Sequence, residues 1–323
     1  MQNAIGIFTS RINNKIHTMT KKYDIIWSEE LDSTNEEARR RISDLDNLSV
    51  LSALSQTAGR GQRGNTWSSE AGRNLTFSIV LKFMSGTDTP SDERSVHEAL
   101  PPLKASDQFV ISEIAALSVV ELLGTIGLKS EIKWPNDIYV GPKKICGMLI
   151  ENTLRGNHLS SSIIGIGLNV NQKDFDISLP NPTSMLLEVT KPEYFPALSE
   201  KSAINTCEPV ADYDIEALLN GFMDIFVTLI DRYMSDRQDS FEELRDEYLS
   251  HLWRLNETAR FIDYTVLPSG HSDKPVVTGI TDATGREFTG IIRGLSPVGN
   301  LLVEERQTGQ IREFGFKDIG YIL

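Results

Sequence analysis

The sequence predicts a protein of the α+β class, and three observations carry that prediction. The first half alternates short apolar, β-branched runs with turns rich in Gly and Pro. Residues 215–253 repeat apolar side chains at helical spacing, and the chain after Thr258 consists of short β-rich runs. We therefore expect a mixed-sheet domain followed by a small antiparallel β-barrel of roughly sixty residues.

The first expected elements are a strand at 25–27, a helix at 33–42 and a strand at 49–54. The start of the helix is indicated by Ser33 and Glu36, whose spacing of three fits a capping box. Capping alone would explain Ser33, although polar side chains at a helix N-terminus can also hydrogen-bond a ligand.

The later elements follow from alternation, helical spacing and turn residues. The expected elements are strands at 74–83 and 162–171, a helix at 109–126, three strands between 131 and 151 separated by Pro135 and by the Gly141-Pro142 turn, a short helix at 183–186, helices at 215–234 and 240–253, and β-rich runs at 261–266, 276–281, 287–295, 300–305 and 310–314. The polar stretch 85–106 is expected to be a mobile insertion.

The composition limits the classes of function. A formal net charge of −13 argues against a general binder of nucleic acids or membrane surfaces, so any site for a polyanion must be local. The segment 56–83 has the opposite balance, with four basic residues (Arg60, Arg63, Arg73 and Lys82) against the single acid Glu70. No run reaches the length of a membrane span, and no secretory signal is evident, so we expect a soluble, cytoplasmic protein.

The cysteines and the N-terminus add little chemistry. Cys146 and Cys207 lack metal-ligand or Cys-x-x-Cys spacing and are interpreted as packed thiols of a reducing compartment. Residues 1–22 contain no Asp or Glu and loosely resemble a transit peptide, but a flexible extension is the simpler interpretation.

The most informative stretch is Gly59-Arg60-Gly61-Gln62-Arg63-Gly64-Asn65-Thr66-Trp67. Its letters match the dinucleotide fingerprint, but that motif must open a helix, whereas here a turn and a strand-like run follow. A strand–loop–strand element remains. Its glycines would let the backbone approach a ligand, and its arginines offer forked donors for a carboxylate or phosphate. A flexible turn with solvated arginines is the alternative.

A second informative stretch runs from Glu131 to Glu151 and places Lys143 and Lys144 at the mouth of a strand, near Trp134, Asn136 and Asp137. Solvated lysines of a hairpin would be the plain interpretation. The run 163–170 adds a strand whose glycines permit close backbone approach and whose exit at Asn169 could face the same ligand.

Taken together, these motifs closely resemble biotin–protein ligases. The motifs that carry the resemblance are Gln56 to Trp67, Lys133-Trp134-Pro135-Asn136-Asp137, Lys143-Lys144-Ile145-Cys146-Gly147 and Gly165-Ile166-Gly167-Leu168-Asn169. The likeness extends from about Trp27 to the C-terminus and includes Asp32-Ser33-Thr34-Asn35. It implies a catalytic domain of the biotin/lipoate ligase type at 23–257 and an SH3-like barrel at 258–323, after the flexible extension 1–22.

The resemblance implies a reaction in two steps. Biotin and MgATP would give biotinyl-5'-AMP and pyrophosphate, and a lysine of a biotin carboxyl carrier domain would then displace AMP. The first step brings a carboxylate to a triphosphate, so negative charge must be neutralised while the reactants are aligned. The related alternatives are a lipoate or octanoate ligase of the same fold and a non-catalytic biotin-binding module.

The resemblance also assigns residues by role. The implied catalytic residues are Lys144, Arg60 and Arg63. Those implied for biotin are Ser33, Thr34, Asn35, Gln56, Arg60, Gly61, Gln62, Trp67 and Lys144. Those implied for the nucleotide are Gly64, Asn65, Trp134, Asn136, Asp137 and Asn169. No protein metal site is expected, because Mg²⁺ would arrive with ATP.

The sequence departs from the family pattern at two places. Gln62 stands where the pattern often has arginine, so one charge that would help to retain the adenylate is missing. Fewer than 25 residues precede Tyr23, too few for the DNA-binding winged helix that some members carry. We therefore expect a ligase without repressor activity, with no DNA or membrane partner.

Overall fold

The computed structural model describes residues 23–85, 99–191, 211–235, 240–266 and 285–322. The strands of the first sheet are β1 (Asp24–Leu31), β2 (Ser49–Gln56), β3 (Leu75–Lys82), β4 (Glu131–Lys133), β5 (Asp137–Val140), β6 (Lys143–Arg155) and β7 (His158–Leu168). Their order is β1-β2-β3-β7-β6-β5-β4. Only β1 and β2 pair in parallel, joined through the helix α2 (Thr34–Arg40), and the other neighbours are antiparallel.

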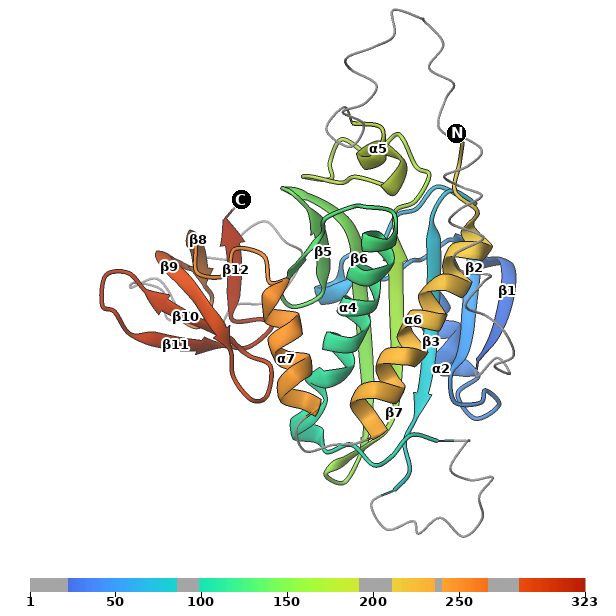
Figure 1. Cartoon of the computed structure of the whole chain (residues 1–323), viewed down its shortest axis with the longest axis horizontal. Helices are drawn as coiled ribbons and strands as arrows, with labels where there is room; N and C mark the ends of the chain where they lie inside the picture. The colour runs from blue at the N-terminus through green and yellow to red at the C-terminus, as the bar shows by residue number, and fades with distance from the viewer. Residues whose placement is uncertain (1–22, 86–98, 192–210, 236–239, 267–284, 323) are drawn as a thin grey trace, which may run out of the picture.

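Both faces of this sheet are covered. Helices α4 (Phe109–Thr125), α6 (Ile215–Ser235) and α7 (Ser240–Ser250) lie on one face, and α2 packs on the other (Figure 1). Alternation along β3 divides its side chains between the two sides. Phe77 and Ile79 join the large core beneath the three helices, whereas Val80 joins a small cluster with Ala38 of α2.

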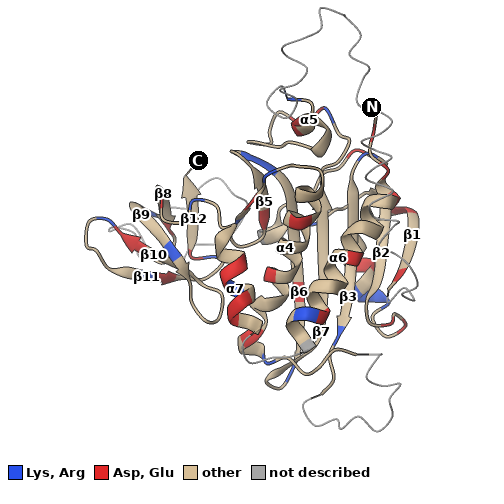
Figure 2. Cartoon of the chain, in the orientation of Figure 1, with Lys and Arg blue, Asp and Glu red and all other residues tan. Residues whose placement is uncertain are grey.

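Helix α4 is the central helix of the larger core. Helix α4 belongs to the stretch Ala105–Thr125, which is long and apolar enough to cross a membrane. However, 72% of the most apolar part of this stretch is buried within the fold. A helix that is apolar on all sides is expected at the centre of a core. The acidic residues of α6 and α7, coloured red in Figure 2, are mainly exposed to solvent.

The C-terminal strands form a second sheet. β8 (Thr258–Asp263), β9 (Arg286–Leu295), β10 (Leu301–Glu305), β11 (Ile311–Phe314) and β12 (Ile319–Ile322) pair in the order β11-β10-β9-β8-β12, all antiparallel. Its core contains the stacked rings of Phe261, Phe288 and Phe314. Within the described residues, no pairing of β11 with β12 closes this sheet into a barrel.

The α+β prediction is confirmed, with local corrections. Ser33 occupies the N-cap position of α2 without a side-chain capping bond. The Glu36 carboxylate, the other half of the expected capping box, pairs with Arg39 and Arg60, and the Ser33 N–H donates to Asp32. The helix ends at Arg40, two residues earlier than expected. Helix α7 ends at Ser250 rather than at 253.

Other predictions are corrected at the edges of elements. The segment 99–106 is not a loose insertion, since Leu100 pairs beside Phe83 and Leu103 is buried. The strand β12 was not predicted, because a four-residue edge strand gives almost no alternation. The expected extension 1–22, most of the insertion, the run 276–281 and Cys207 lie outside the described residues.

Candidate functional site

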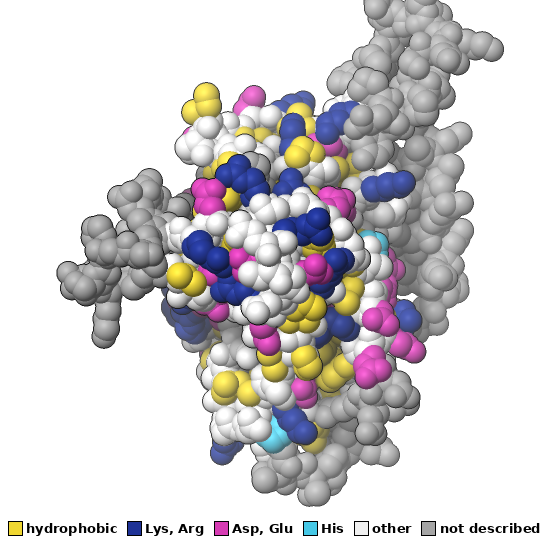
Figure 3. All heavy atoms as spheres, turned by 90° about the vertical axis from the view of Figure 1, so that its left-hand side faces the viewer, with side chains coloured by type: hydrophobic (Ala, Val, Ile, Leu, Met, Phe, Trp, Pro, Cys, Tyr) yellow, Lys and Arg dark blue, Asp and Glu magenta, His cyan; other side chains and the backbone are white. Residues whose placement is uncertain are grey.

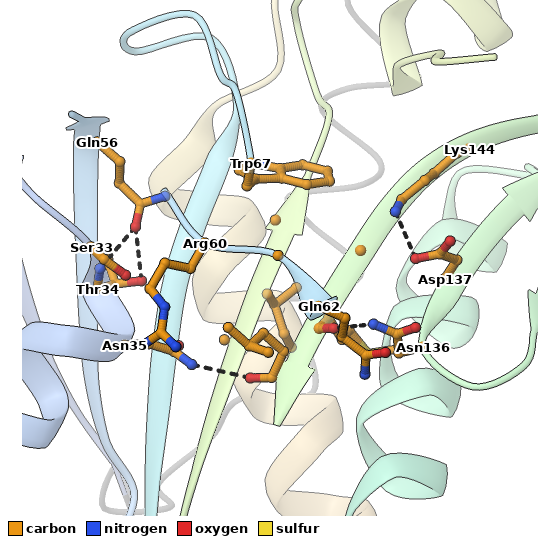
Figure 4. Close-up of a pocket in the computed structure, with 17 residues that line it drawn as sticks. Ser33, Thr34, Asn35, Gln56, Arg60, Gln62, Trp67, Asn136, Asp137 and Lys144 are labelled. Carbon is orange, nitrogen blue, oxygen red and sulfur yellow. Dashed lines mark hydrogen bonds and ion pairs between the residues drawn. The ribbon is translucent and has the colours of Figure 1, made fainter. Parts of the chain in front are cut away.

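A single cavity gathers side chains from five segments of the chain (Figure 4). It lies where the start of α2, the end of β2, the loop 59–67, the β5–β6 hairpin and β7 meet, and it encloses about 460 Å³ of space, part of it open to solvent. The lining residues are Ser33, Thr34, Asn35, Gln56, Arg60, Gly61, Gln62, Trp67, Asn136, Asp137, Lys144, Gly147, Met148, Leu149, Gly165, Ile166 and Gly167. The predicted motifs, separated by up to about 130 positions, therefore meet at one place.

One end of the cavity is a network of neutral polar groups. The side-chain oxygen of Gln56 accepts from the backbone N–H of Thr34 at 2.8 Å, and the Ser78 hydroxyl lies 2.8 Å from the Thr34 hydroxyl. Asn35 accepts from the Ser78 hydroxyl at 2.6 Å and donates to Glu151 of β6 at 2.9 Å. Ser33, Thr34 and Asn35 are almost fully buried, so this end is preorganised by bonds within the protein.

The loop 59–67 closes on itself as a small hairpin. The Trp67 backbone N–H donates to the Gly59 carbonyl at 2.9 Å, and the Gly61 N–H donates to the Asn65 carbonyl at 2.7 Å. A Cβ at Gly59 would lie 2.4 Å from the Trp67 carbonyl oxygen, so this crossing requires glycine. The loop contains a three-residue 3₁₀ turn (Gln62–Gly64) and is followed along the chain by β3, which confirms the predicted strand–loop–strand element.

The indole ring of Trp67 packs against two glycines of the sheet. A Cβ at Gly167 would lie 2.3 Å from the ring, and a Cβ at Gly147 would lie 3.0 Å from it. The indole N–H is buried and has no hydrogen-bond partner among the described residues. The sheet therefore makes room for a flat aromatic ring against Gly147 and Gly167.

Arg60 is held by carboxylates from two other elements. Its guanidinium pairs with Glu36 of α2 and lies 3.4 Å from Glu151 of β6. Arg60 is 40% exposed, so these pairs do not seal it from solvent. The arginine predicted to meet an anion is thus directed to an acidic pair beside the cavity.

Lys144 lies at the other end of the cavity. Its ammonium pairs with Asp137 at 2.7 Å and lies 5.7 Å from the centre of the Trp67 ring. Its backbone is fixed on both sides, because its N–H donates to Asn181 and its carbonyl accepts from Thr183. The structure thus places Lys144 in the cavity and not in solvent at a hairpin tip.

Asn136 also reaches the cavity, and its side-chain amide donates to the Met148 carbonyl. In Figure 4, Asn136, Asp137 and Lys144 lie opposite the Ser33, Thr34 and Gln56 end, with Trp67 between the two. The cavity therefore has a neutral polar end and a charged end.

Four predicted residues do not line the cavity. Trp134 is buried, and its indole N–H donates to the Gly299 carbonyl at 3.0 Å. Asn169 is buried and donates to the Thr183 carbonyl, which supports the segment that fixes Lys144. Gly64 and Asn65 lie in the 59–67 loop outside the lining. The backbone of Arg63 belongs to the same loop, and its side chain lies outside the described part. Their nucleotide or catalytic roles stay predictions.

Sequence reasoning missed several contributors. Gly147, Met148 and Leu149 of β6 and Ile166 of β7 line the cavity, and Glu36 and Glu151 hold Arg60. The glycines at 165 and 167 gave the only signal, through their spacing of two in a strand. A Cβ at Gly165 would lie 2.1 Å from the Asn35 side-chain oxygen, so this glycine admits the buried amide.

The ionisable groups near the cavity include no activated nucleophile. Burial raises the pKa of the Cys146 thiol, which leaves that thiol protonated and inert. Hydrogen bonds from Arg40 hold the pKa of Asp32, next to Ser33, well below its usual range. Within the described residues, no cluster of three or more His, Cys, Asp or Glu side chains could hold a metal ion. The arrangement suits binding and charge neutralisation, not covalent catalysis.

Comparison with known proteins agrees with this geometry. The model of the biotin/lipoate A/B protein ligase family matches residues 27–169. A biotin–[acetyl-CoA-carboxylase] ligase of Paracoccus denitrificans is 32% identical over 142 residues, which are 43% of this chain and 51% of the relative. The bifunctional ligase/repressor BirA of Bacillus subtilis (strain 168) is 31% identical over 169 residues, which are 52% and 46% of the two chains. The chain thus spans about half the length of these relatives.

The fold is shared with solved structures over nearly the whole chain. The biotin protein ligase of Aquifex aeolicus in complex with biotin and ATP superposes with a TM-score of 0.60 at 24% identity, covering 92% of this chain and 97% of that one. The apo structure of that ligase gives a TM-score of 0.55 at 20% identity. The chain thus has the fold of the biotin protein ligases, and its residues 27–169 match the model of the biotin/lipoate A/B protein ligase family.

Proposed function

We propose that this chain is a biotin–protein ligase that makes biotinyl-5'-AMP from biotin and ATP and then transfers biotin to a carrier-domain lysine. The observation that carries the proposal is the single cavity with a neutral polar end, a tryptophan wall and cations at both sides. The Aquifex relative with this fold was solved with biotin and ATP.

Biotin fits the cavity in one orientation. Its neutral ureido ring would meet the Ser33, Thr34, Asn35 and Gln56 end, and its apolar body would lie along Trp67 and Gly167. The carboxylate would then lie between Arg60 and Lys144.

The chemistry of the first step is charge neutralisation and alignment. A carboxylate oxygen of biotin attacks the α-phosphorus of ATP, and the bond from that phosphorus to the β-bridging oxygen breaks, releasing pyrophosphate. Lys144 would leave Asp137 to meet the α-phosphate, while Arg60 and Gln62 hold the acyl side. Removal of one such preorganised donor typically costs ~10²–10³ in rate.

Magnesium is expected to enter with the triphosphate. Asp137 and Asn136 bring oxygen atoms to the charged end, the ligand type that Mg²⁺ prefers, and they would supplement the phosphate oxygens and waters around the ion. Bound Mg²⁺ would neutralise phosphate charge. Asp137 would then exchange Lys144 for the ion.

In the second step, the amine of a carrier lysine attacks the acyl carbon, AMP leaves, and an amide forms. We propose a biotin carboxyl carrier domain as the partner, in the cytoplasm, without DNA or membrane. The relatives called biotin–[acetyl-CoA-carboxylase] ligases support this partner. We also propose 23–257 as the catalytic domain and 258–323 as a separate C-terminal domain, in keeping with the two sheets.

A direct assay tests the proposal. Purified chain with biotin, MgATP and a carrier domain should yield biotinyl-5'-AMP, pyrophosphate and a biotinylated lysine, all detectable by mass spectrometry. Absence of both the adenylate and the labelled carrier would refute it. Parallel thermal shifts with biotin, lipoate and octanoate distinguish the related ligases, because a dithiolane or alkyl chain cannot use the donors and acceptors of the Thr34 and Gln56 end.

A further inference from the structure

Lys133 lies in a cage of aromatic rings beside the charged end of the cavity. Its ammonium donates to the Tyr139 hydroxyl at 3.0 Å and lies 5.1 Å from the ring centre of Tyr321 and 5.6 Å from that of Trp253. The rings come from β5, from the segment after α7 and from β12 of the C-terminal sheet. Aromatic faces attract a cation through their quadrupole without neutralising its charge.

The other described cations around the cavity are already paired. Arg60 faces Glu36 and Glu151, and Lys144 faces Asp137. The formal charges of these two cations and three carboxylates sum to −1. A net negative charge would repel a triphosphate and a biotin carboxylate. No carboxylate lies within ion-pair distance of Lys133 among the described residues, and its ammonium is held by a hydroxyl and by aromatic rings instead.

Strand register places this charge next to the nucleotide end. Lys133 pairs directly opposite Asp137 in the β4–β5 hairpin, and Tyr139 follows two residues later. Directly opposed residues and residues two apart share one face of a sheet. Lys133, Asp137 and Tyr139 therefore lie on one face, and Asp137 itself lines the cavity and holds Lys144.

Lys133 and Tyr139 of the first sheet meet Tyr321 of the C-terminal sheet at a contact that we call the seam. One hydrogen-bonding group in the seam has no partner in the described part of the chain. The Tyr321 hydroxyl is buried and has no hydrogen-bond partner among the described residues. Figure 3, which views the molecule from the side of the C-terminal sheet, shows Lys and Arg side chains gathered on this face among scattered acids. An anion reaching the seam from Asp137 would meet a caged ammonium and a vacant phenolic donor.

We propose that Lys133 is a phosphate-binding residue, which holds the β- and γ-phosphates of the nucleotide and the pyrophosphate they become. This inference rests on the ligase proposal and extends its site from Lys144 to the seam between β4 and β12. As biotin oxygen attacks the α-phosphorus, the electron pair of the broken bond passes to pyrophosphate, and Lys133 lies where that charge would accumulate. The aromatic cage fixes the ammonium without the competing carboxylate that Lys144 has.

The test compares Lys133→Met with Lys133→Arg, and Lys129→Met serves as the control. Lys129 lies two residues before β4 and is exposed. We expect Lys133→Met to raise both the KM for ATP and the inhibition constant of inorganic pyrophosphate by at least about tenfold. This is the size of effect expected from the loss of one charge-assisted contact. The biotin Kd should stay unchanged, Lys133→Arg should retain most of the affinity, and Lys129→Met should match wild type. Unchanged ATP and pyrophosphate constants, or equal losses for ATP and biotin, would overturn the inference.

A second measurement uses the wild-type chain and needs no substitution. Reductive methylation of lysines, read by mass spectrometry, should slow at Lys133 when inorganic pyrophosphate is added and not when biotin alone is added. Lys129 should react equally in all samples. Equal labelling of Lys133 with and without pyrophosphate would overturn the inference. If the wild type makes no biotinyl-5'-AMP yet shows this protection, the ligase proposal fails and the phosphate site stands.

Discussion

Trp67 and Trp134 lie in two regions that the chain organises in opposite ways. Trp67 forms a wall of the cavity, rests on Gly147 and Gly167, and keeps its indole N–H without a partner among the described residues. Trp134 lies in the seam between the two sheets, donates to the Gly299 carbonyl and packs edge-on against Phe316. Both tryptophans belong to motifs that suggested ligand binding. Of these two tryptophans, the one that lines the cavity has the unpartnered donor, and the one in the seam uses its donor within the protein.

This difference predicts a separation of effects. Substitutions of cavity residues whose internal contacts are partly exposed, such as the Lys144–Asp137 pair, should change activity and affinity with little change in stability. Substitutions in the seam should change the free energy of unfolding.

The largest effect is expected for Lys144→Met. Loss of the ammonium removes the group placed to neutralise the α-phosphate, so formation of biotinyl-5'-AMP should slow by ~10²–10³. The melting temperature should stay close to that of wild type, since the pair with Asp137 is partly exposed. Single-turnover adenylation followed by mass spectrometry measures the effect. Lys143→Met, at the exposed neighbouring position, is the matched control, and equal rates for the two variants would remove the role given to Lys144.

Gly167→Ala should weaken biotin binding next most strongly. The new Cβ would lie 2.3 Å from the Trp67 ring, so the indole must move and the apolar wall is lost. A loss of about 10-fold or more in affinity corresponds to about 1.4 kcal/mol, less than the burial of one aromatic side chain typically contributes. Calorimetric titration with biotin measures it. Gly124→Ala in α4, where no atom lies near the added Cβ, controls for the loss of a glycine, and it should bind biotin as wild type does.

Trp134→Phe should act on stability instead. It leaves the Gly299 carbonyl without its donor and removes part of a buried ring, at a cost of about 2–3 kcal/mol in the free energy of unfolding. Urea denaturation measures this cost, with Trp27→Phe at a partly exposed position as the control. A normal stability with a raised KM for ATP would instead support the predicted nucleotide role of Trp134 and break the contrast between the two regions.

The motifs and the family resemblance they carry predicted most of the residues that line the cavity. Glycines spaced by two in a strand permit close approach and arginines between glycines offer anion contacts, but the motifs alone left a flexible turn as an alternative. Glu151, a partner of Arg60, could not be predicted, because the two residues are over 90 positions apart in the chain. Glu151 reaches Arg60 only after β6 has paired with β7 in the assembled sheet. Pairing register depends on the assembled sheet.

The sequence also could not distinguish residues that line a site from those that support it. Asn169 and Lys144 belong to two motifs that both carried the family resemblance. In the structure, Asn169 is buried and donates to the Thr183 carbonyl, whereas Lys144 lines the cavity. In β12, only one of the four residues is buried and the other three are partly exposed, so there was no alternation to detect. Burial, which decides such cases, comes from tertiary packing and not from local pattern.

The smallest expected effect is a pH dependence that originates in the seam. Glu113 of α4 is buried, pairs with Arg245 and lies near the Tyr248 hydroxyl, and Arg245 also donates to the Ser296 carbonyl at 2.7 Å. Burial outweighs the arginine and raises the pKa of Glu113 to about 7. A carboxyl whose folded pKa exceeds its unfolded pKa contributes stability at acid pH that is lost as pH rises from about 4.5 to about 7.

Each unit of pKa shift corresponds to about 1.4 kcal/mol. Between about pH 4.5 and about pH 7, ionisation of Glu113 should therefore lower the free energy of unfolding of the wild type by at least about 1 kcal/mol. Glu113→Gln, which cannot ionise, should flatten this part of the profile in urea denaturation at pH 5 and pH 7.5. Glu242→Gln, at a surface position of α7, should keep the wild-type slope. If the Glu113→Gln profile matched wild type, Arg245 would be holding the carboxylate ionised throughout. The seam would then be a charged contact, and its distinction from the cavity would rest on Trp134 alone.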